Sequence, residues 1–512
     1  MLYFNCDYTE GAHPRVLEKM LETNLEQTVG YGEDPYCEAA RELIRRECQR
    51  QDVDVQFLVG GTQTNFTVIR AALRPYQGVL SPATGHINGH ETGAVEATGH
   101  KVLALPTGPE GKLTAAQVEE VSEEVAQLEE PEPVGDPQEL PTIIAVMNES
   151  FTDMAATSDG NITLSQDNLP FLHSLQESGE VVWGTAYSSV YGGNTCNSEY
   201  EFLTGNTTAF LPSGSKPYQQ YVDHEQTSLV SLLKDTYDYE CIAIHPGQAS
   251  AWERDDAYQY LGFDEFIDVS KFDVHRKLEH GLTSDISSYD QVIYEYEHRD
   301  KDKPLFLFNV TIQNHGGYED EDYETTVQVN EAPGEYPQAE QYLSLTKKSD
   351  EALEYLIDYF SQQEEPVVIL FFGDHWPNLE QDFLSLLLGE DSNALSFENV
   401  MREYEAPFLI WANYDLEGEE IEAVSLNYLS GLLLRAAGLE GTDYTTFLEN
   451  LRQTLPVITA MGVLDCDGNW YKNGDETPYD ELLNEYNILE YNNAFGGNGK
   501  SMETFTLNIG FG

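Results

Sequence analysis

The chain has 512 residues, with 90 Asp and Glu against 26 Lys and Arg, and a formal net charge of −64. A hydrophobic content of 40% and an aromatic content of 11% suffice for packed cores, so composition excludes a globally disordered chain, and the length predicts more than one domain. A surface this negative attracts divalent cations and repels phosphate backbones. We therefore expect no nucleic-acid partner.

The first predicted elements occupy a segment that is less acidic than the rest. Residues 1–131 hold 10 basic and 21 acidic side chains, a net of −11, which leaves −53 of the total for residues 132–512. Helical periodicity and strand-like apolar runs alternate here, as in an α/β fold. We predict helices over 14–23, 34–51 and 64–73, and strands over 55–59, 78–81 and 101–105.

A boundary follows this segment. An acidic helical pattern over 115–133 stops at Pro131 and Pro133, and further prolines follow before a new buried strand begins. We therefore divide the chain into residues 1–131, a linker at 132–140, a second segment at 141–495 and a C-terminal tail at 496–512. Neither a run of 18 apolar residues nor a signal-peptide pattern is found, so we expect a soluble chain without an integral membrane segment.

The second segment has four short apolar runs, bounded by turns or polar residues and separated by helical stretches such as 339–360. This alternation predicts a mainly parallel sheet buried on both faces, in which functional groups gather at the carboxyl ends of the strands. The runs are 143–147, 240–245, 304–312 and 366–373.

Polar side chains of matching chemistry follow these runs. Glu149 follows the first run, and Asp374 and His375 follow the last, so two carboxylates and an imidazole are available for a divalent cation. Thr195 comes after a Gly-Gly-Asn turn and before a predicted helix start, and His315 follows the third run. Each residue alone is also typical of a helix cap or a surface loop, but their shared placement favours one site.

Several long motifs in the second segment carry a resemblance, among them NESF (148–151), GGNTCNSEYEFLTGN (192–206), FNVTIQNHGGY (308–318), FFGDHWP (371–377) and PFLIWANYD (407–415). They are similar to the extracellular catalytic domain of lipoteichoic-acid synthases, which are phosphoglycerol transferases of the sulfatase and alkaline-phosphatase superfamily. The resemblance implies an α/β fold with a mostly parallel sheet between helices.

By position, the resemblance implies the role of each residue. Thr195 matches the nucleophile and also completes a metal shell with Glu149, Asp374 and His375. The implied ion is Mn²⁺, with Mg²⁺ or Zn²⁺ as alternatives. The residues that match substrate-contacting positions are Trp252, Arg254 and His315. The implied reaction passes phosphoglycerol from a phosphatidylglycerol-like or soluble glycerophosphodiester donor to an acceptor hydroxyl.

Three features depart from that family, one of them that the stretch after His245-Pro246 lacks the tyrosines expected there. Asn194 stands where a third glycine is commoner, although Asn tolerates left-handed backbone angles. The membrane-spanning helices of the family are absent from this sequence, which makes hydrolysis, or transfer from soluble donors, an alternative to transfer from a lipid.

The first segment contains the motifs FLVGGTQTNFTVIRAALRP (57–75) and TGHINGHETGAVEATGHKVLALP (84–106), which resemble the start of a different group, the pyridoxal-phosphate-dependent threonine aldolases and β-eliminating lyases. The resemblance implies a truncated α/β fragment of an aminotransferase-type fold. Its phosphate loop and the residue that stacks on the cofactor ring match Gly60, Gly61, Thr62, Gln63 and His86. The Schiff-base lysine belongs to the part of such enzymes that is missing here, so we do not expect pyridoxal phosphate to bind.

Three functions therefore stay open. The first is a metal-dependent phosphoglycerol transferase or phosphodiesterase, the second a pyridoxal-dependent lyase, and the third a non-catalytic acidic scaffold. The sequence leaves open the acceptor, the metal, the oligomeric state and the location in the cell.

Overall fold

A computed structural model gives the fold of most of the chain. The described residues are 11–30, 32–48, 50, 53–73, 79–82, 84–91, 93–98, 100, 102–105, 133–137 and 139–495. Among them, no helix is long and apolar enough to cross a bilayer. The predicted acidic helix over 115–133, except its last residue, and the C-terminal tail fall outside these ranges.

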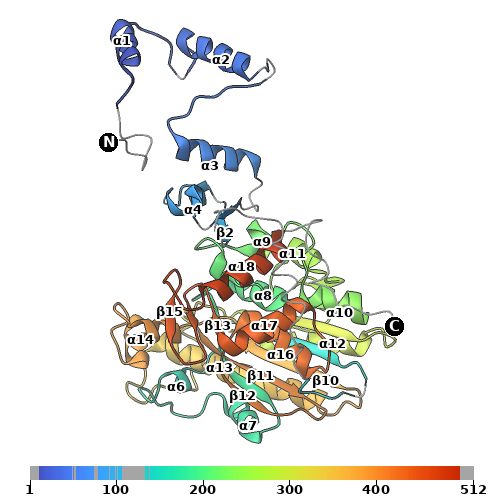
Figure 1. Ribbon diagram of the computed structural model, residues 1–512. Helices are drawn as coiled ribbons and strands as arrows, with labels where there is room; N and C mark the ends of the chain where they lie inside the picture. Colours follow the sequence, from blue (N-terminus) through green and yellow to red (C-terminus); the bar gives the residue numbers. More distant parts are fainter. Residues whose placement is uncertain are drawn as a thin grey trace.

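An eight-stranded sheet is the centre of the molecule (Figure 1). The strand order is β12-β4-β11-β10-β3-β9-β5-β6, and the five strands from β10 to β6 run parallel. Only β11 pairs antiparallel with both neighbours, while β12 pairs parallel with β4. The strands are β3 (Thr142–Asn148), β4 (Val182–Tyr187), β5 (Glu240–Ile244), β6 (Glu265–Ile267), β9 (Leu305–Val310), β10 (Val367–Gly373), β11 (Glu405–Ala412) and β12 (Glu419–Ser425).

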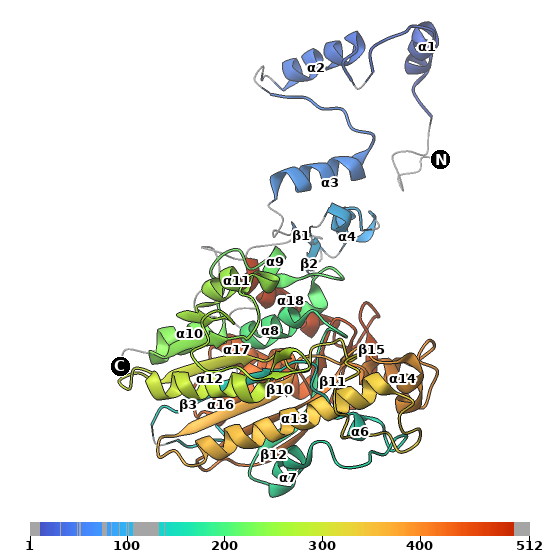
Figure 2. The same cartoon turned by 180° about the vertical axis from the view of Figure 1, so that it is seen from behind.

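Helices cover both faces of this sheet, as Figures 1 and 2 show from opposite sides. The side chains of β3 explain the layering, since successive residues of a strand point to opposite faces. Ile143, Ala145 and Met147 belong to one core, and Ile144 and Val146 belong to the other. Helices of the first core are α8 (Thr195–Thr204), α9 (Pro217–Gln220), α10 (Leu229–Tyr237), α11 (Arg254–Leu261), α16 (Leu429–Ala436), α17 (Asp443–Thr454) and α18 (Asp480–Phe495). Those of the second are α7 (Pro170–Ser178), α12 (Asp285–His298) and α13 (Pro337–Phe360).

Smaller elements lie around this body. They are α6 (Met154–Thr157), α14 (Gln381–Leu388), α15 (Phe397–Arg402), the hairpin β7 (Leu278–Glu279) with β8 (Leu282–Thr283), the sheet β13 (Val457–Ile458), β14 (Gly462–Leu464) and β15 (Trp470–Lys472), and the 3-10 turns η2 (Thr208–Phe210), η3 (Ala251–Glu253) and η4 (Leu426–Tyr428).

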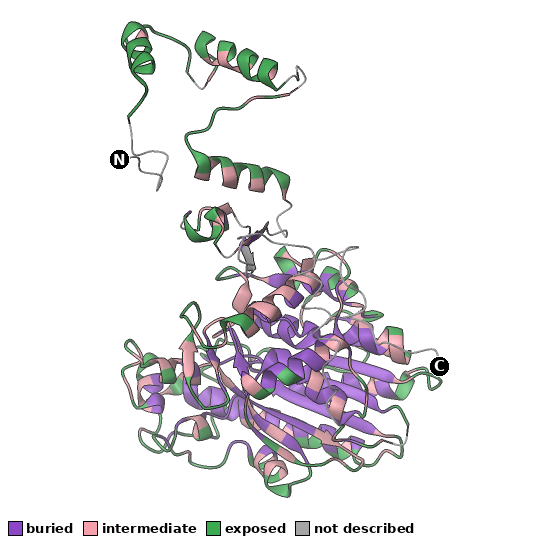
Figure 3. Ribbon diagram, in the orientation of Figure 1, coloured by how far each residue is buried: buried purple, intermediate pink, exposed green. Residues whose placement is uncertain are grey.

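The N-terminal helices stand apart from the body (Figures 1 and 3). None of the three longest has a buried residue. One parallel strand pair lies between them and the body. The elements are α1 (Pro14–Thr23), α2 (Pro35–Glu47), α3 (Gly61–Ala72), α4 (His86–Gly89), η1 (Glu96–Thr98), β1 (Val79–Pro82) and β2 (Val102–Leu105).

The sequence patterns match part of this architecture. All four apolar runs of the second segment are strands of one sheet, three N-terminal helices lie where periodicity predicts them, and the stretch 339–360 lies within α13. The strand predicted over 55–59 is wrong, because residues 53–58 form no ladder. A strand exists only through its pairing partner, and the described β1 and β2 pair with each other.

Candidate metal and nucleophile site

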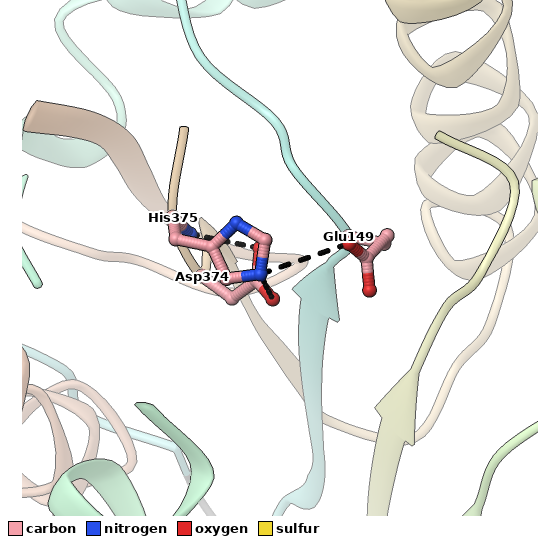
Figure 4. Close-up of side chains that lie close together, drawn as sticks. All are labelled: Glu149, Asp374 and His375. Carbon is pink, nitrogen blue, oxygen red and sulfur yellow. Dashed lines mark hydrogen bonds and ion pairs between the residues drawn. The ribbon is translucent and has the colours of Figure 1, made fainter. Parts of the chain in front are cut away.

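Glu149, Asp374 and His375 meet at the carboxyl edge of the sheet (Figure 4). The parallel strands β3 and β10 pair in register up to Asn148 and Gly373, and the residues that directly follow these two strand ends are Glu149 and Asp374. One ligand-type atom from each of the three side chains lies within 4.8 Å of the others. Strand register therefore brings together residues that are more than 200 positions apart.

This cluster is buried, and it holds two carboxylates but only one imidazole. Asp374 Oδ1 accepts hydrogen bonds from the backbone N–H groups of Ser150 and His375 at 2.7 and 2.8 Å, whereas Oδ2 is buried without a hydrogen bond. Burial and the negative charge of Glu149 raise the pKa of Asp374 to about 7. For His375, burial lowers the pKa, but the neighbouring carboxylates of Asp374 and Glu149 outweigh it and the net shift is upward.

The donor set fits a divalent cation. Nδ1 of His375 donates to the Trp376 carbonyl at 2.9 Å, because a carbonyl oxygen can only accept. Nε2 therefore faces the carboxylates, 3.2 Å from Asp374 Oδ2 and 3.8 Å from Glu149 Oε1. Two carboxylates, one of them with an oxygen that lacks a hydrogen bond, and an imidazole are the ligands that such ions take.

Thr195 reaches this cluster from the first residue of α8. Three consecutive residues before it, Gly192, Gly193 and Asn194, have positive φ angles of 64°, 145° and 66°. This turn places Thr195 Oγ1 3.5 Å from Glu149 Oε2 and 3.4 Å from His375 Nε2. All ten residues of α8 are buried, so the hydroxyl is presented by a fixed helix end.

A cavity of about 370 Å³ opens on these groups. Five of the sequence-predicted residues line it together with His375, whereas the fully buried Asp374 does not line it. Those five are Glu149, Thr195, Trp252, Arg254 and His315. The roles of these residues stay predictions, but they share one pocket.

His245 also lines the cavity and is not among the sequence-predicted residues. It directly follows β5, so the strand-end rule that singles out Glu149 could have found it. Its Nδ1 donates to the Val310 carbonyl at 2.9 Å. Burial and the positive charge of Arg254 lower the pKa of His245 to about 3, so the ring is neutral, with Nε2 as an acceptor.

Arg254 has a buried partner of its own. Its Nε and Nη2 both donate to Oε1 of Glu199, at 2.9 and 2.5 Å, and both side chains are almost fully buried. Beside it, Lys216 Nζ lies 4.7 Å from the centre of the Trp252 ring. Sequence reasoning missed Glu199, although it lies within the motif at 192–206, and it missed Lys216, because neither residue follows the end of a predicted strand.

The N-terminal candidates lie at and beside one helix end. Gly60 is the N-cap of α3, which begins at Gly61 and continues through Thr62 and Gln63, as the phosphate-loop comparison implies. Glu91 then links α3 to His86, since its Oε1 accepts from Asn65 at 2.6 Å and lies 2.8 Å from His86 Nδ1. These residues are thus connected, but their role as a cofactor loop stays a prediction.

Comparison with known families gives two matches. The sulfatase profile matches residues 141–439, and the β-eliminating lyase profile matches residues 4–134. A Rhizobium meliloti protein named for cyclic β-1,2-glucan modification is 30% identical over 370 residues, covering 70% of this chain and 55% of that protein. The lipoteichoic acid synthase of Staphylococcus saprophyticus is 26% identical over 271 residues, covering 51% of this chain and 40% of the synthase. The chain therefore spans about half the length of these relatives.

A solved structure shows the same fold. The phosphoglycerol transferase GacH from Streptococcus pyogenes, in complex with sn-glycerol-1-phosphate, superposes with a TM-score of 0.60 at 20% identity, covering 77% of this chain and 95% of that structure. The predicted alkaline-phosphatase-like fold class and both sequence resemblances are confirmed. Because its profile matches more than half of the sequence, the chain belongs to the sulfatase family of enzymes.

Proposed function

We propose that this chain is a metal-dependent phosphotransferase or phosphodiesterase that uses Thr195 as its nucleophile. The carrying observation is the position of Thr195 Oγ1, 3.5 Å from Glu149 Oε2 and 3.4 Å from His375 Nε2. A buried threonine at the edge of a metal-ligand cluster, inside an open cavity, suits attack on phosphorus better than a structural role.

The ion would be held by Glu149, Asp374, His375 and the Thr195 hydroxyl. When bound, a divalent cation lowers the pKa of a hydroxyl and offsets the negative charge of a phosphate. Mn²⁺, Mg²⁺ and Zn²⁺ all accept this mixture of oxygen and nitrogen donors.

Each residue of the site then has its own role in the reaction. Thr195 Oγ1 forms a bond to phosphorus and gives up its proton, while the ester bond to the leaving alcohol breaks and that oxygen takes up a proton. Arg254 binds the phosphate oxygens through the N–H groups that Glu199 leaves free, and His315, exposed on the cavity rim, can protonate the leaving oxygen. An acceptor hydroxyl or water next attacks the phosphorus and releases Thr195.

The substrate class follows from the family and the cavity. Relatives named as lipoteichoic acid synthase and phosphoglycerol transferase support a phosphatidylglycerol-like lipid or a soluble glycerophosphodiester as donor. The relative named for β-glucan modification supports a sugar hydroxyl as acceptor. The cavity of about 370 Å³ suits the phosphoglycerol head group of either donor.

Replacing the nucleophile tests the proposal. Thr195→Ala removes the attacking oxygen, so turnover of a soluble glycerophosphodiester in the presence of Mn²⁺ should fall by at least about 1000-fold, in line with the loss of a covalent catalyst. Thr204→Ala is the matched control, because Thr204 is buried at the other end of α8 and bonds only within that turn. Equal turnover by wild type and Thr195→Ala would rule out the threonine mechanism.

Metal loading is tested separately. A ligand that binds only the folded chain stabilises it, by about 2.7 kcal/mol at 100 times its Kd, so Mn²⁺ should raise the thermal midpoint of the wild type. In Asp374→Asn the rise should vanish, since the ligand charge is lost. If none of Mn²⁺, Mg²⁺ and Zn²⁺ changed the thermal midpoint of the wild type, the result would contradict the proposed metal site.

A further inference from the structure

Glu199 connects the helix that begins with Thr195 to the arginine of the cavity. Arg254 donates from Nε and Nη2 to Oε1 of Glu199, and the relative exposures of the two side chains are 2% and 0%. An arginine has five N–H groups, and Nη1 also donates to the Ala251 carbonyl at 3.5 Å, so one N–H on Nη1 and one on Nη2 stay free. They form the end of the guanidinium fork, the edge that matches two phosphate oxygens.

Both carboxylate oxygens of Glu199 accept hydrogen bonds from residues of one helix, α11. Oε1 accepts from Arg254, and Oε2 accepts from the Tyr258 hydroxyl at 2.7 Å. Arg254 and Tyr258 are four residues apart and therefore lie on the same face of α11. A single carboxylate thus fixes the start of α11 against α8.

The position of Glu199 on α8 sets where the arginine can lie. Glu199 follows Thr195 by four residues, so the two share a face of α8 and are about 6 Å apart along the axis. Whatever Glu199 holds is consequently placed one helical turn behind the nucleophile. The Ser198 hydroxyl, which donates to the Asp374 carbonyl at 2.8 Å, fixes the same turn of α8 to the metal cluster.

The segment that delivers Arg254 is strained and needs such an anchor. Trp252 and Glu253 both have φ angles of 61°, a left-handed conformation that side chains rarely adopt. Strained turns persist where surrounding contacts over-determine them. Here the contacts are the Glu199 carboxylate after the turn and Lys216 over the Trp252 ring.

We infer that Glu199 is a positioning residue, which holds the free fork of Arg254 at phosphate distance from Thr195. The inference rests on the proposed function, since it assumes a phosphate in the cavity. Glu199 itself does not line the cavity, so it would touch neither metal nor substrate. Its loss should therefore weaken phosphate binding while leaving the metal cluster intact.

The test is calorimetric binding of sn-glycerol 1-phosphate in the presence of Mn²⁺, together with the Mn²⁺ shift in thermal midpoint. In Glu199→Gln the Kd should rise by about tenfold or more, as expected for losing a hydrogen bond to a charged group, with the Mn²⁺ shift retained. Glu201→Gln is the matched control. Glu201 is equally buried on α8, but it bonds to Ser189, Thr207 and Thr208.

The outcomes separate the two proposals. Wild-type affinity in Glu199→Gln, or an equal loss in Glu201→Gln, overturns the positioning role and leaves the proposed function standing. A wild-type protein that binds no glycerol phosphate overturns both. Should Glu199→Gln not fold, Tyr258→Phe decides, because it removes the hydroxyl that donates the 2.7 Å bond to Oε2 and keeps the ring. A two- to threefold weaker Kd then supports the role, in proportion to one weaker hydrogen bond, and an unchanged Kd overturns it.

Discussion

The position of one hydroxyl depends on the backbone of the three residues before it. Gly192 and Gly193 adopt positive φ angles at little cost, and Asn194 adopts φ 66° and ψ 39° because its short polar side chain tolerates the left-handed region. An added Cβ at Gly192 would also lie 2.4 Å from Nδ2 of Asn378, so a side chain there would displace the amide that donates to the Gly192 carbonyl. The turn aims Thr195 at the metal cluster.

Asn194 gives a prediction at this scale. Asn194→Ala should lower the free energy of unfolding by about 1 kcal/mol, because alanine lacks the polar group that eases left-handed angles, whereas Asn194→Gly should leave stability near that of the wild type. Urea unfolding of both variants measures the difference. Equal stability of the two variants would show that the turn is not strained.

Elements are held together here by carboxylates that lie far away in sequence. The first amides of α7 donate to Asp350 of α13, through Phe171 and Leu172 at 2.9 and 2.8 Å. In addition His173 joins α7 to the loop after β3, with Nε2 2.8 Å from Asp153 and Nδ1 2.9 Å from Asp167. Such contacts explain why a short helix keeps one position on the sheet.

The His173 contact predicts a pH dependence. Hydrogen bonds to Asp153, opposed by partial burial and helped by Asp167, raise the pKa of His173 from 6.5 to about 9. The stabilisation is therefore fully present below pH 6.5 and is lost as the pH rises through about 9. His173→Gln should cost more stability at pH 6 than at pH 10, in urea unfolding at each pH. A cost that is independent of pH would show that the contact is not ionic.

The sequence predicts some of these elements and not others, for physical reasons. Runs such as PVVILFFG are buried on both faces and therefore uniformly apolar, which makes β10 visible. By contrast β12, with the sequence EEIEAVS, is an edge strand with partly exposed acidic residues, and β4 includes Gly184 and Thr185. The Glu199–Arg254 pair joins two helices 55 residues apart, so only the tertiary structure brings it to light.

At the scale of the whole molecule, the two segments that match the two families differ in how far their residues are buried. The sulfatase-like part is a sheet between two cores, whereas α1, α2 and α3 bury no residue, and Leu25 and Val59 are 92% and 96% exposed. We propose that residues 141–495 form the catalytic unit by themselves. The contacts of Val134 and Gly135, whose N–H groups donate to the Arg435 carbonyl, mark where the chain joins this body.

Limited proteolysis tests this division. Trypsin should cut first near Arg41, Arg45 and Arg46 of the exposed α2, because the central sheet and its helices protect the later sites. The remaining large fragment should keep the Mn²⁺ shift in thermal midpoint and the turnover of the intact chain. Early cleavage within residues 141–495, or loss of the Mn²⁺ shift with the N-terminal part, would contradict an independent catalytic unit.

The in-register pairing of β3 with β10 has one last consequence. Glu149 and Asp374 are neighbours only because Asn148 stands opposite Gly373, and a slip of one position would reverse the direction of every later side chain. A misaligned sheet could thus still be compact and apolar inside, but it would hold no ion. Binding of a cation during folding would accordingly stabilise only the sheet with this register, which is also the register that assembles the proposed metal site.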